Sequence, residues 1–445
     1  MRGLKFKKLP SGNLLVIDPF SGFWGIVYNS SQIKKLKAHY REVKESLKVA
    51  RDYITNRVKI SHIELHPSEG CNLDCEYCYV PKGFRETGPR LSIANARIIL
   101  SKMEDYALRE GLSTITITFH GGEPLLCKDL ILEIVEIFNR NHLRFDIQTN
   151  GTLLDEGFLK EVCRYGVKIG FSLDGWKELN DSMRKFKDGK GCFEKVMESI
   201  ELYKKYFGKI CLICVVHKFN VNFLADMIYF FHKVGVSSLF LNPVSPSNRG
   251  TVGLVPDIAT LAEHYKRALL AQIEINKLNP PDNRIYINNI EALFLNIVAD
   301  YQPCVCYQSP CGAGKDMLTV MSNGDVYPCS EFISKREFLV GNLVKENVET
   351  IIKHPVCRTL RKRTVKVLPK CKDCLYAYIC CGNCPFSSYF YYNTLEHPPY
   401  YCEFYEQLIT FLFQLIEEYG MELFPLVVKD AERLKNLEAY YQLLE

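Results

Sequence analysis

The sequence predicts an α/β fold, a partial (β/α)6 TIM-like barrel that follows a small N-terminal α+β unit and precedes a C-terminal cysteine-rich domain. Three observations predict it. Six strand-like segments alternate with helical patterns from residue 58 onward. The 445 residues are enough for two to three domains. The 19 cysteines are unevenly placed, with three between Cys71 and Cys78 and eleven between Cys304 and Cys402.

The first unit is expected to span residues 1–57. Short strands are expected over 13–17 and 25–28, on either side of the turn-rich segment 18–22. A charged helix should follow over 31–57, because Ile33, Leu36 and Tyr40 recur at helical spacing. The barrel is then expected over 58–300 and the cysteine-rich domain, with a closing helix over 403–419, over 301–445.

The barrel is expected from a regular alternation of strands and helices. The strand candidates are 60–65, 114–119, 144–148, 167–173, 210–216 and 238–241, and the helical patterns are 92–110, 127–141, 155–165, 192–207 and 222–234. Alternation of this kind predicts a parallel sheet with right-handed crossovers and chemistry at the C-terminal ends of the strands. Six units rather than eight predict an open barrel with room for a large substrate.

Composition excludes several classes of protein. The net charge of +5 is too small for a nucleic-acid-binding surface, and no segment approaches the ~18 apolar residues of a membrane span. The first eight residues carry charge but precede no apolar stretch, so no signal peptide is expected. A cytoplasmic protein keeps its thiols reduced, and clustered cysteines there are typical metal ligands.

The first cysteine cluster comes directly after the first barrel strand. Cys71, Cys75 and Cys78 can converge on one metal centre. A zinc site would need a fourth ligand from a distant part of the chain, and this remains the alternative. A four-iron cluster held by three thiolates keeps one iron open for a cofactor that must bind the metal itself.

The C-x3-C-x2-C spacing, with Tyr77 before the last cysteine, resembles the radical S-adenosylmethionine (SAM) superfamily. Residues 121–124 resemble that family's glycine-rich loop. The resemblance implies that Gly121, Gly122 and Glu123 hold the SAM amino group, that Ser172 contacts the ribose and that Arg184 meets the carboxylate. It also implies one-electron cleavage of SAM to a 5′-deoxyadenosyl radical, which abstracts hydrogen from the substrate.

The second cysteine region resembles the SPASM extension of radical SAM enzymes. A C-x2-C pair alone would fit a zinc ribbon, but seven cysteines are too many for one tetrahedral zinc. The resemblance implies two auxiliary clusters, and hence three 4Fe–4S clusters in all. The ligands implied for the first are Cys311, Cys329 and Cys384, and those implied for the second are Cys371, Cys374, Cys380 and Cys402. The fourth ligand of the first cluster is expected at Cys306, with Cys304 or an open iron as alternatives.

The resemblance also limits the expected substrates, partners and products of the reaction. SPASM enzymes mostly modify peptides, so the expected partners are a precursor peptide or protein and an external electron donor such as flavodoxin or ferredoxin, with no nucleic acid and no membrane. The expected product is a thioether or another side-chain crosslink. Sulfatase maturases, which make formylglycine, are similar but carry an aspartate where this chain has Ser330, and Glu331 is the candidate substitute base.

Other functions remain open on the sequence. The N-terminal unit is a candidate module for binding a substrate's leader segment by strand addition. A non-catalytic iron–sulfur electron carrier and a zinc-stabilised binding protein are the alternatives to an enzyme.

Overall fold

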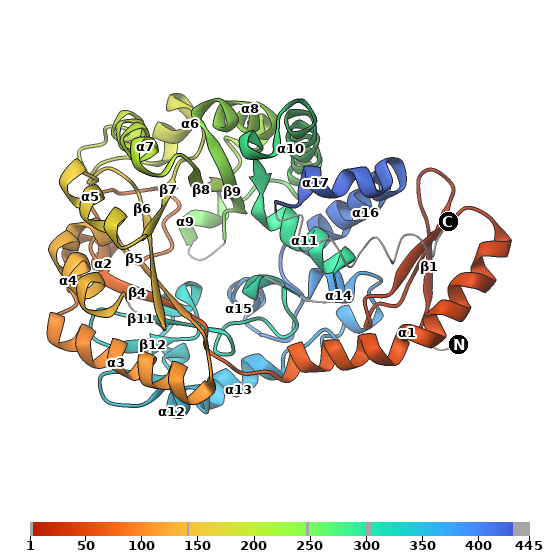
Figure 1. Cartoon of the computed structure of the whole chain (residues 1–445), viewed down its shortest axis with the longest axis horizontal. Coiled ribbons are helices and arrows are strands. Elements are labelled where there is room, and N and C mark those ends of the chain that lie inside the picture. Colours follow the sequence, from red (N-terminus) through yellow and green to blue (C-terminus); the bar gives the residue numbers. More distant parts are fainter. Residues whose placement is uncertain (1–2, 140–141, 246–248, 300–301, 303, 430–445) are drawn as a thin grey trace.

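The computed structural model describes residues 3–139, 142–245, 249–299, 302 and 304–429. The boundary expected between 300 and 301, and the last part of the third domain, 430–445, lie outside the described residues. Figure 1 shows the barrel at one end of the molecule and the N-terminal unit at the other, with the C-terminal elements between them.

The six predicted barrel strands are confirmed as one parallel sheet. They are β4 (His62–Ser68), β5 (Ile115–Gly121), β6 (Leu143–Thr149), β7 (Lys168–Ser172), β8 (Ile210–Val216) and β9 (Val236–Pro243), paired in that order. The helices between them are α3 (Ile93–Glu110), α4 (Lys128–Phe138), α5 (Glu156–Arg164), α7 (Phe193–Phe207) and α8 (Leu224–Val234). Polar caps begin two of these helices, since Ser92 accepts from the Asn95 amide and Asp155 accepts from the Phe158 amide.

The sheet extends beyond the barrel at both ends. β10 (Tyr286–Ile287) pairs with β9, and β11 (Met317–Val320) pairs in parallel with β4. β12 (Asp325–Tyr327) and β13 (Gly341–Asn342) complete a ten-stranded sheet. β11 and β12 form an antiparallel hairpin before Cys329, with Gly324 at a φ of +88° in its turn. The C-terminal domain thus shares its first strands with the barrel.

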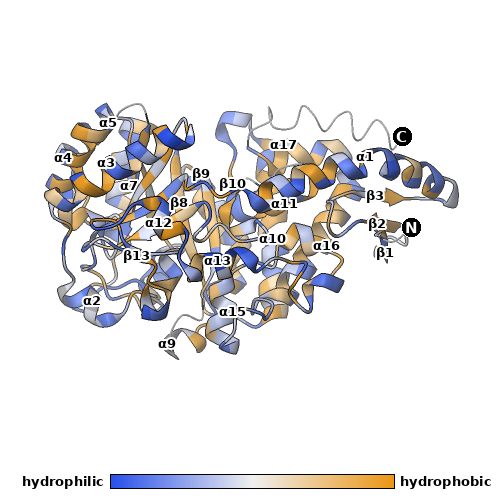
Figure 2. Ribbon diagram, turned by 90° about the horizontal axis from the view of Figure 1, so that it is seen from below, coloured by the Kyte–Doolittle hydropathy of each residue, from blue (hydrophilic) through white to orange (hydrophobic). Residues whose placement is uncertain are grey.

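The N-terminal unit is a three-stranded antiparallel sheet with one long helix. β2 (Leu14–Ile17), β3 (Trp24–Val27) and α1 (Ser30–Asn56) confirm the predicted elements, and β1 (Lys5–Lys8) adds an edge strand. Asn29 and Gln32 form a capping box that begins α1. Hydrophobic and hydrophilic residues alternate along α1, as Figure 2 shows, so only one side of the helix is apolar.

The long helix that follows the barrel packs on a helix of the C-terminal region. α10 (Ile258–Leu278) packs on α16 (Cys402–Tyr419), where the Tyr265 and Phe404 rings lie 4.8 Å apart. The other α-helices are α2 (Lys82–Thr87), α6 (Lys177–Met183), α9 (Arg249–Val252), α11 (Asn288–Val298), α12 (Val348–Ile352), α13 (Pro355–Lys362), α14 (Ala377–Cys380), α15 (Pro385–Tyr392) and α17 (Phe424–Val427). Within the described ranges, no helix combines the length and apolar character needed to cross a bilayer.

Candidate functional site

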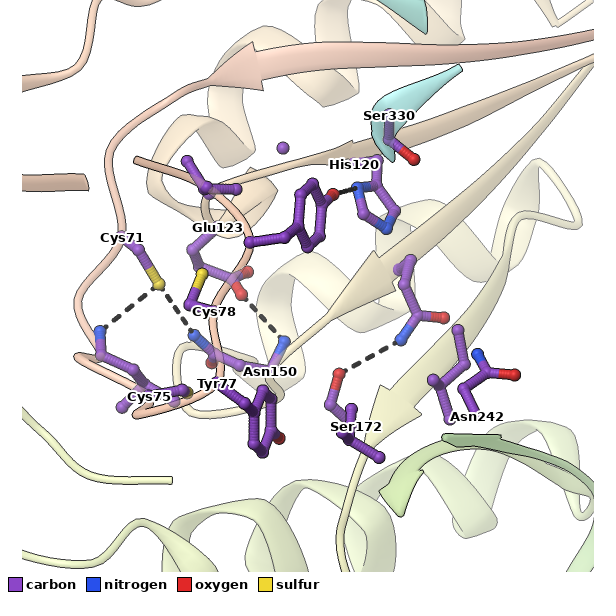
Figure 3. Close-up of a pocket in the computed structure, with 18 of the residues that line it drawn as sticks. Cys71, Cys75, Tyr77, Cys78, His120, Glu123, Asn150, Ser172, Asn242 and Ser330 are labelled. Carbon is purple, nitrogen blue, oxygen red and sulfur yellow. Dashed lines mark hydrogen bonds between the residues drawn. The ribbon is translucent and has the colours of Figure 1, made fainter. Parts of the chain in front are cut away.

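A cavity of about 350 Å³ opens at the C-terminal ends of the barrel strands. The three predicted thiols, on Cys71, Cys75 and Cys78, line it from the loop after β4 (Figure 3). The Cys71 sulfur accepts hydrogen bonds from the Leu73 amide at 3.4 Å and from Asn150 Nδ2 at 3.8 Å. Burial raises the pKa of Cys71 to about 11, so this thiol stays protonated until a metal displaces the proton.

The predicted glycine-rich loop lies in the same cavity wall. Gly121 has a φ of +108°, a conformation that favours glycine. A Cβ on Gly122 would lie 2.2 Å from the Gly70 carbonyl oxygen and 2.5 Å from that of Glu69. These two glycines let the loop after β5 press against the loop that carries the thiols.

Glu123 is fully buried and organises the ends of two strands. Its carboxylate accepts hydrogen bonds from the Leu125 amide at 2.9 Å, the Thr149 hydroxyl at 2.6 Å and the Asn150 amide at 2.8 Å. Burial raises the pKa of Glu123, and these donors oppose the shift. Two carboxylate oxygens offer about four acceptor positions, so about one remains for an amino group in the cavity.

Arg184 and Ser172 line the same cavity as the thiols. Arg184 donates a 2.6 Å hydrogen bond to the Tyr77 hydroxyl, which in turn bonds Asp174. The Arg184 Nε is buried and has no hydrogen-bond partner in the described part of the chain. Ser172 accepts a 3.3 Å hydrogen bond from Gln148 Nε2.

Two carboxylates, those of Glu64 and Glu331, also line the cavity, and we call the part around them its acidic end. Glu64 on β4 accepts from the Thr319 hydroxyl at 2.6 Å and the Ser330 amide at 3.2 Å, both through Oε2. The Glu331 carboxyl also lines the cavity, and its Oε2 is buried without a hydrogen-bond partner among the described residues. The Tyr79 hydroxyl lies 3.4 Å from His120 Nδ1 beside them.

The two carboxylates differ in pKa. Burial opposes ionisation of Glu64, but the charges of His120 and His62 hold its pKa below the usual value. Burial raises the pKa of Glu331 to about 7; a hydrogen bond with the Ser245 side chain opposes the shift, and the nearby charge of Glu64 adds to it. Environments that separate two carboxyl pKa values allow one group to be ionised while the other carries a proton.

The first predicted set of auxiliary ligands comes together behind this acidic end. Cys311, Cys329 and Cys384 all pack against one apolar cluster that includes Phe332. Burial raises the pKa of Cys329, and the charges of Cys311 and Cys384 add to the shift.

Cys306 and Cys304, the two candidates for the fourth position, differ in their neighbours. A hydrogen bond with Cys304 raises the pKa of Cys306, and the charges of Cys311 and Cys329 raise it further. The same hydrogen bond lowers the pKa of Cys304 to about 7, and neither Cys311 nor Cys329 contributes to that shift. Of the two thiols, only that of Cys306 has a pKa raised by the charges of Cys311 and Cys329.

The second predicted set lines a separate, smaller cavity. Its walls carry four thiols together with Lys370 and Glu406; the four are Cys371, Cys374, Cys380 and Cys402. Cys381 is not part of it. Its thiol is buried and donates to the Tyr378 carbonyl at 2.7 Å.

The donor sets suit multi-iron clusters. Thiolates are the ligands of iron–sulfur clusters, and three thiols line the main cavity while four line the smaller one. The main cavity adds room for a cofactor of ordinary drug-like size.

Several residues of the site were not predicted from the sequence. Glu64, Tyr77, Asn150 and Asp174 all contact predicted residues or line the same cavity. Tyr77 was noted only as an aromatic before Cys78. Asp174 had a clear signal, because it follows the fourth barrel strand where loop residues face the cavity.

Comparisons with known proteins agree with this geometry. Residues 65–228 match the family model described as "Radical SAM superfamily", and residues 311–375 match the model "Iron-sulfur cluster-binding domain", SPASM. An uncharacterized protein from Archaeoglobus fulgidus is 30% identical over 97% of both chains. A cysteine-type anaerobic sulfatase-maturating enzyme from Clostridium perfringens is 26% identical over 78% of this chain and 94% of its own.

Two solved structures share the fold. One, described as "Native anSMEcpe with bound AdoMet and Cp18Cys peptide", has a TM-score of 0.70 at 23% identity and covers 80% of this chain and 98% of its own. The other, Streptococcus suis SuiB bound to precursor peptide SuiA, has a TM-score of 0.55 at 15% identity and covers 90% and 98%. Matching models, a full-length relative and the cysteine-lined cavities lead to one conclusion: the chain belongs to the radical SAM superfamily and is an enzyme of its SPASM-containing group.

Proposed function

We propose that this enzyme removes two electrons from a side chain of a peptide or protein. One observation carries the proposal: a single cavity is lined both by three cysteine thiols and by two carboxylates, those of Glu64 and Glu331. A ligand that fills the cavity could touch both sets. Relatives and neighbours named for sulfatase maturation or for a bound peptide support a polypeptide substrate.

The residues of the thiol end would hold the cofactors. Cys71, Cys75 and Cys78 would bind a 4Fe–4S cluster, and Gly121, Gly122, Glu123, Ser172 and Arg184 would hold SAM against it. When bound, this pair supplies a radical that takes one hydrogen atom from the substrate. The buried Arg184 side chain and the neighbouring Tyr77 would orient the SAM carboxylate.

The auxiliary sites would provide the outlet for the second electron. Cys311, Cys329, Cys384 and Cys306 would hold the first auxiliary cluster, and Cys371, Cys374, Cys380 and Cys402 the second, which makes three clusters in all. Cys78 and Cys329 pack against the same apolar cluster, so the main cavity adjoins the first auxiliary site. Flavodoxin or ferredoxin would supply the electron that starts each turnover.

The carboxylate end would handle the proton. The substrate loses a hydrogen atom from a C–H group to the radical. It then loses a proton from an S–H or O–H group and one electron to the auxiliary site, which together complete a two-electron oxidation. Glu64 is ionised by its surroundings and would accept the proton, and Glu331 lies beside it as a second acceptor. Both carboxylates line the cavity, so a substrate side chain bound there would meet them.

Two products are consistent with this chemistry. A thioether or another crosslink in a ribosomally made peptide is the first, supported by the substitution of Ser330 for the aspartate of sulfatase maturases. Formylglycine is the second, supported by the named relatives and by Glu64, whose carboxylate bonds the Ser330 amide. In the first case the N-terminal unit, 1–57, is a candidate for leader binding; both cases suit a cytoplasmic enzyme.

Two measurements test the proposal. Anaerobically reconstituted protein should convert SAM to 5′-deoxyadenosine and methionine, and a variant with Cys71, Cys75 and Cys78 changed to alanine should not. Normal turnover by that variant would overturn the cluster assignment. Mass spectrometry of a co-expressed peptide from a neighbouring gene, and of a synthetic sulfatase-motif peptide, should then show loss of two hydrogens with a blocked thiol, or an aldehyde. Added methyl groups would contradict both.

A further inference from the structure

The segment that carries three thiols of the second auxiliary site is held by the N-terminal unit. Lys5 Nζ donates a 2.6 Å hydrogen bond to the carbonyl of Asp373, which lies between Cys371 and Cys374. The Tyr378 amide, two residues before Cys380, donates a 3.0 Å hydrogen bond to the Pro19 carbonyl. Backbone groups at both ends of the segment are therefore bonded to residues far away in the sequence.

Side-chain packing covers the same segment. Phe20 packs against the small apolar cluster formed by Leu368, Cys371 and Ala377 with Val365, and Cys374 packs against it too. The Arg51 guanidinium carbon lies 3.4 Å from the centre of the Tyr378 ring. Phe20 comes from the turn between β2 and β3, and Arg51 from α1, so different elements of the unit contribute.

The alternation of β1 assigns its side chains to two sides. Lys5 and Lys7 stand opposite Ile17 and Leu15, on the face that meets the C-terminal domain, whereas Phe6 lies opposite Val16 on the face toward α1. The Phe6 ring lies 5.7 Å from Lys37 Nζ, which confirms its side. Both faces of the three-stranded sheet are thus covered, one by α1 and one by the C-terminal domain, as Figure 1 shows.

Lys7 continues the contact along α16. Its Nζ donates to Thr410 Oγ1 at 3.2 Å and lies 5.0 Å from the centre of the Tyr376 ring. The Tyr376 amide donates to the Cys374 sulfur at 3.4 Å, so the lysine supports a residue that bonds a thiol of the set. Lys370 and Glu406 both line this cavity, so charges of both signs lie beside the four thiols, and Lys5 adds a positive one.

We propose that the N-terminal unit is the outer wall of the second auxiliary cluster, with Phe20 excluding water and Lys5 providing positive charge. A cluster bound by four thiolates is anionic, and its potential depends on nearby charge and on solvent exposure. A positive charge beside it stabilises the reduced form. The unit would thereby set how readily this site accepts an electron, a role that rests on the proposed function and does not require the unit to touch the substrate.

The experiment uses the full chain with Cys71, Cys75 and Cys78 changed to alanine, so that only auxiliary clusters remain. Iron content is measured first. The reduction potentials are then measured by redox titration with electron paramagnetic resonance, and cluster loss in air is followed by absorbance. The test variants are Lys5→Gln, Lys5→Arg and Phe20→Ala. The matched controls are Lys8→Gln and Phe6→Ala, on the opposite face of the same strand.

Lys5→Gln should lower the potential of one auxiliary cluster, and Lys5→Arg should restore it. Phe20→Ala should shorten the lifetime of that cluster in air severalfold, while both controls match the parent protein. Unchanged potential and lifetime in Lys5→Gln and Phe20→Ala, with normal iron, would overturn this proposal alone. Protein without auxiliary iron would overturn the cluster assignment as well. If Phe20→Ala does not fold, the reduction potentials of Lys5→Gln and Lys5→Arg alone test the proposal.

Discussion

The Ser330 amide donates a 3.2 Å hydrogen bond to Glu64 Oε2 and thereby joins the residue after Cys329 to the first barrel strand. The bond places a carboxylate from β4 next to the position where sulfatase maturases carry an aspartate. Because Oε2 also accepts from Thr319, the second oxygen, Oε1, is left for a group in the cavity.

Glu64→Gln should uncouple the two halves of the reaction. The amide keeps the size of the side chain but cannot take a proton, so peptide oxidation should fall about 100-fold, in the range of general base catalysis. Formation of 5′-deoxyadenosine should continue. Both are measured by chromatography and mass spectrometry on the same samples, with Glu64→Asp expected to retain part of the activity. Equal peptide oxidation by Glu64→Gln and the parent enzyme would exclude Glu64 as the proton acceptor.

Glu331→Gln should stabilise the folded protein at alkaline pH. The pKa of Glu331 is raised from 4.5 to about 7 in the fold, so ionisation is unfavourable there. Below pH 4 the carboxyl is protonated in both the folded and the unfolded state, so the variant should match the parent in free energy of unfolding. Above pH 7 the parent bears the full cost of ionising this buried carboxyl in the folded state, about 3 kcal/mol by the usual conversion. Urea unfolding at pH 4 and pH 8 measures it, with the exposed Glu418→Gln as control. A gain at pH 4 equal to that at pH 8 would contradict the explanation.

Cys306→Ala and Cys304→Ala should differ in iron content. Three four-iron clusters require about 12 irons per chain. Loss of Cys306 should lower the iron retained after desalting by as much as one cluster, because this thiol lies near Cys311 and Cys329. Loss of Cys304 should leave it unchanged. The reverse pattern would assign the fourth ligand to Cys304, and no change in either variant would indicate an open iron.

Arg184→Met should weaken both the fold and SAM binding. The change leaves Asp174 buried, 4.0 Å from where the guanidinium stood, without its counter-charge. Breaking a buried pair in this way costs about 3–5 kcal/mol. Thermal unfolding and equilibrium dialysis with SAM measure the two effects, and Tyr77→Phe, which removes one hydroxyl, should have a smaller effect on both. Wild-type stability in Arg184→Met would show that the Arg184–Asp174 pair does not stabilise the fold.

The sequence predicted the strands and cysteine sets that can be recognised from neighbouring residues alone. The six barrel strands carry continuous or alternating apolar residues, and the cysteine sets are fixed by residue type and spacing, so both could be read directly. β1 was missed because only Phe6 in Lys5–Lys8 is apolar. β10 and β13 have two residues each, too few for a pattern to emerge.

The acidic end of the cavity could not be predicted because it depends on contacts between distant segments. Glu64 alternates with Ile63 and Leu65, as a polar residue does on the outer face of any strand. Its role becomes visible only when Thr319 and Ser330, more than 250 residues later, are placed beside it. The roles of the individual SAM and cluster ligands remain predictions.

The parallel pairing of β11 with β4 has a consequence for exchanging parts between relatives. Four consecutive register positions, from Met317 opposite His62 to Val320 opposite Leu65, form a continuous hydrogen-bonded seam between the barrel and the cysteine-rich region. In a chimera joined just before residue 311, β4 would come from one relative and β11 from the other, so the pairing between them would have to form from two different sequences. A graft that transfers β4 together with β11 to β13 keeps the seam intact, and with it the spacing between the main cavity and Cys329.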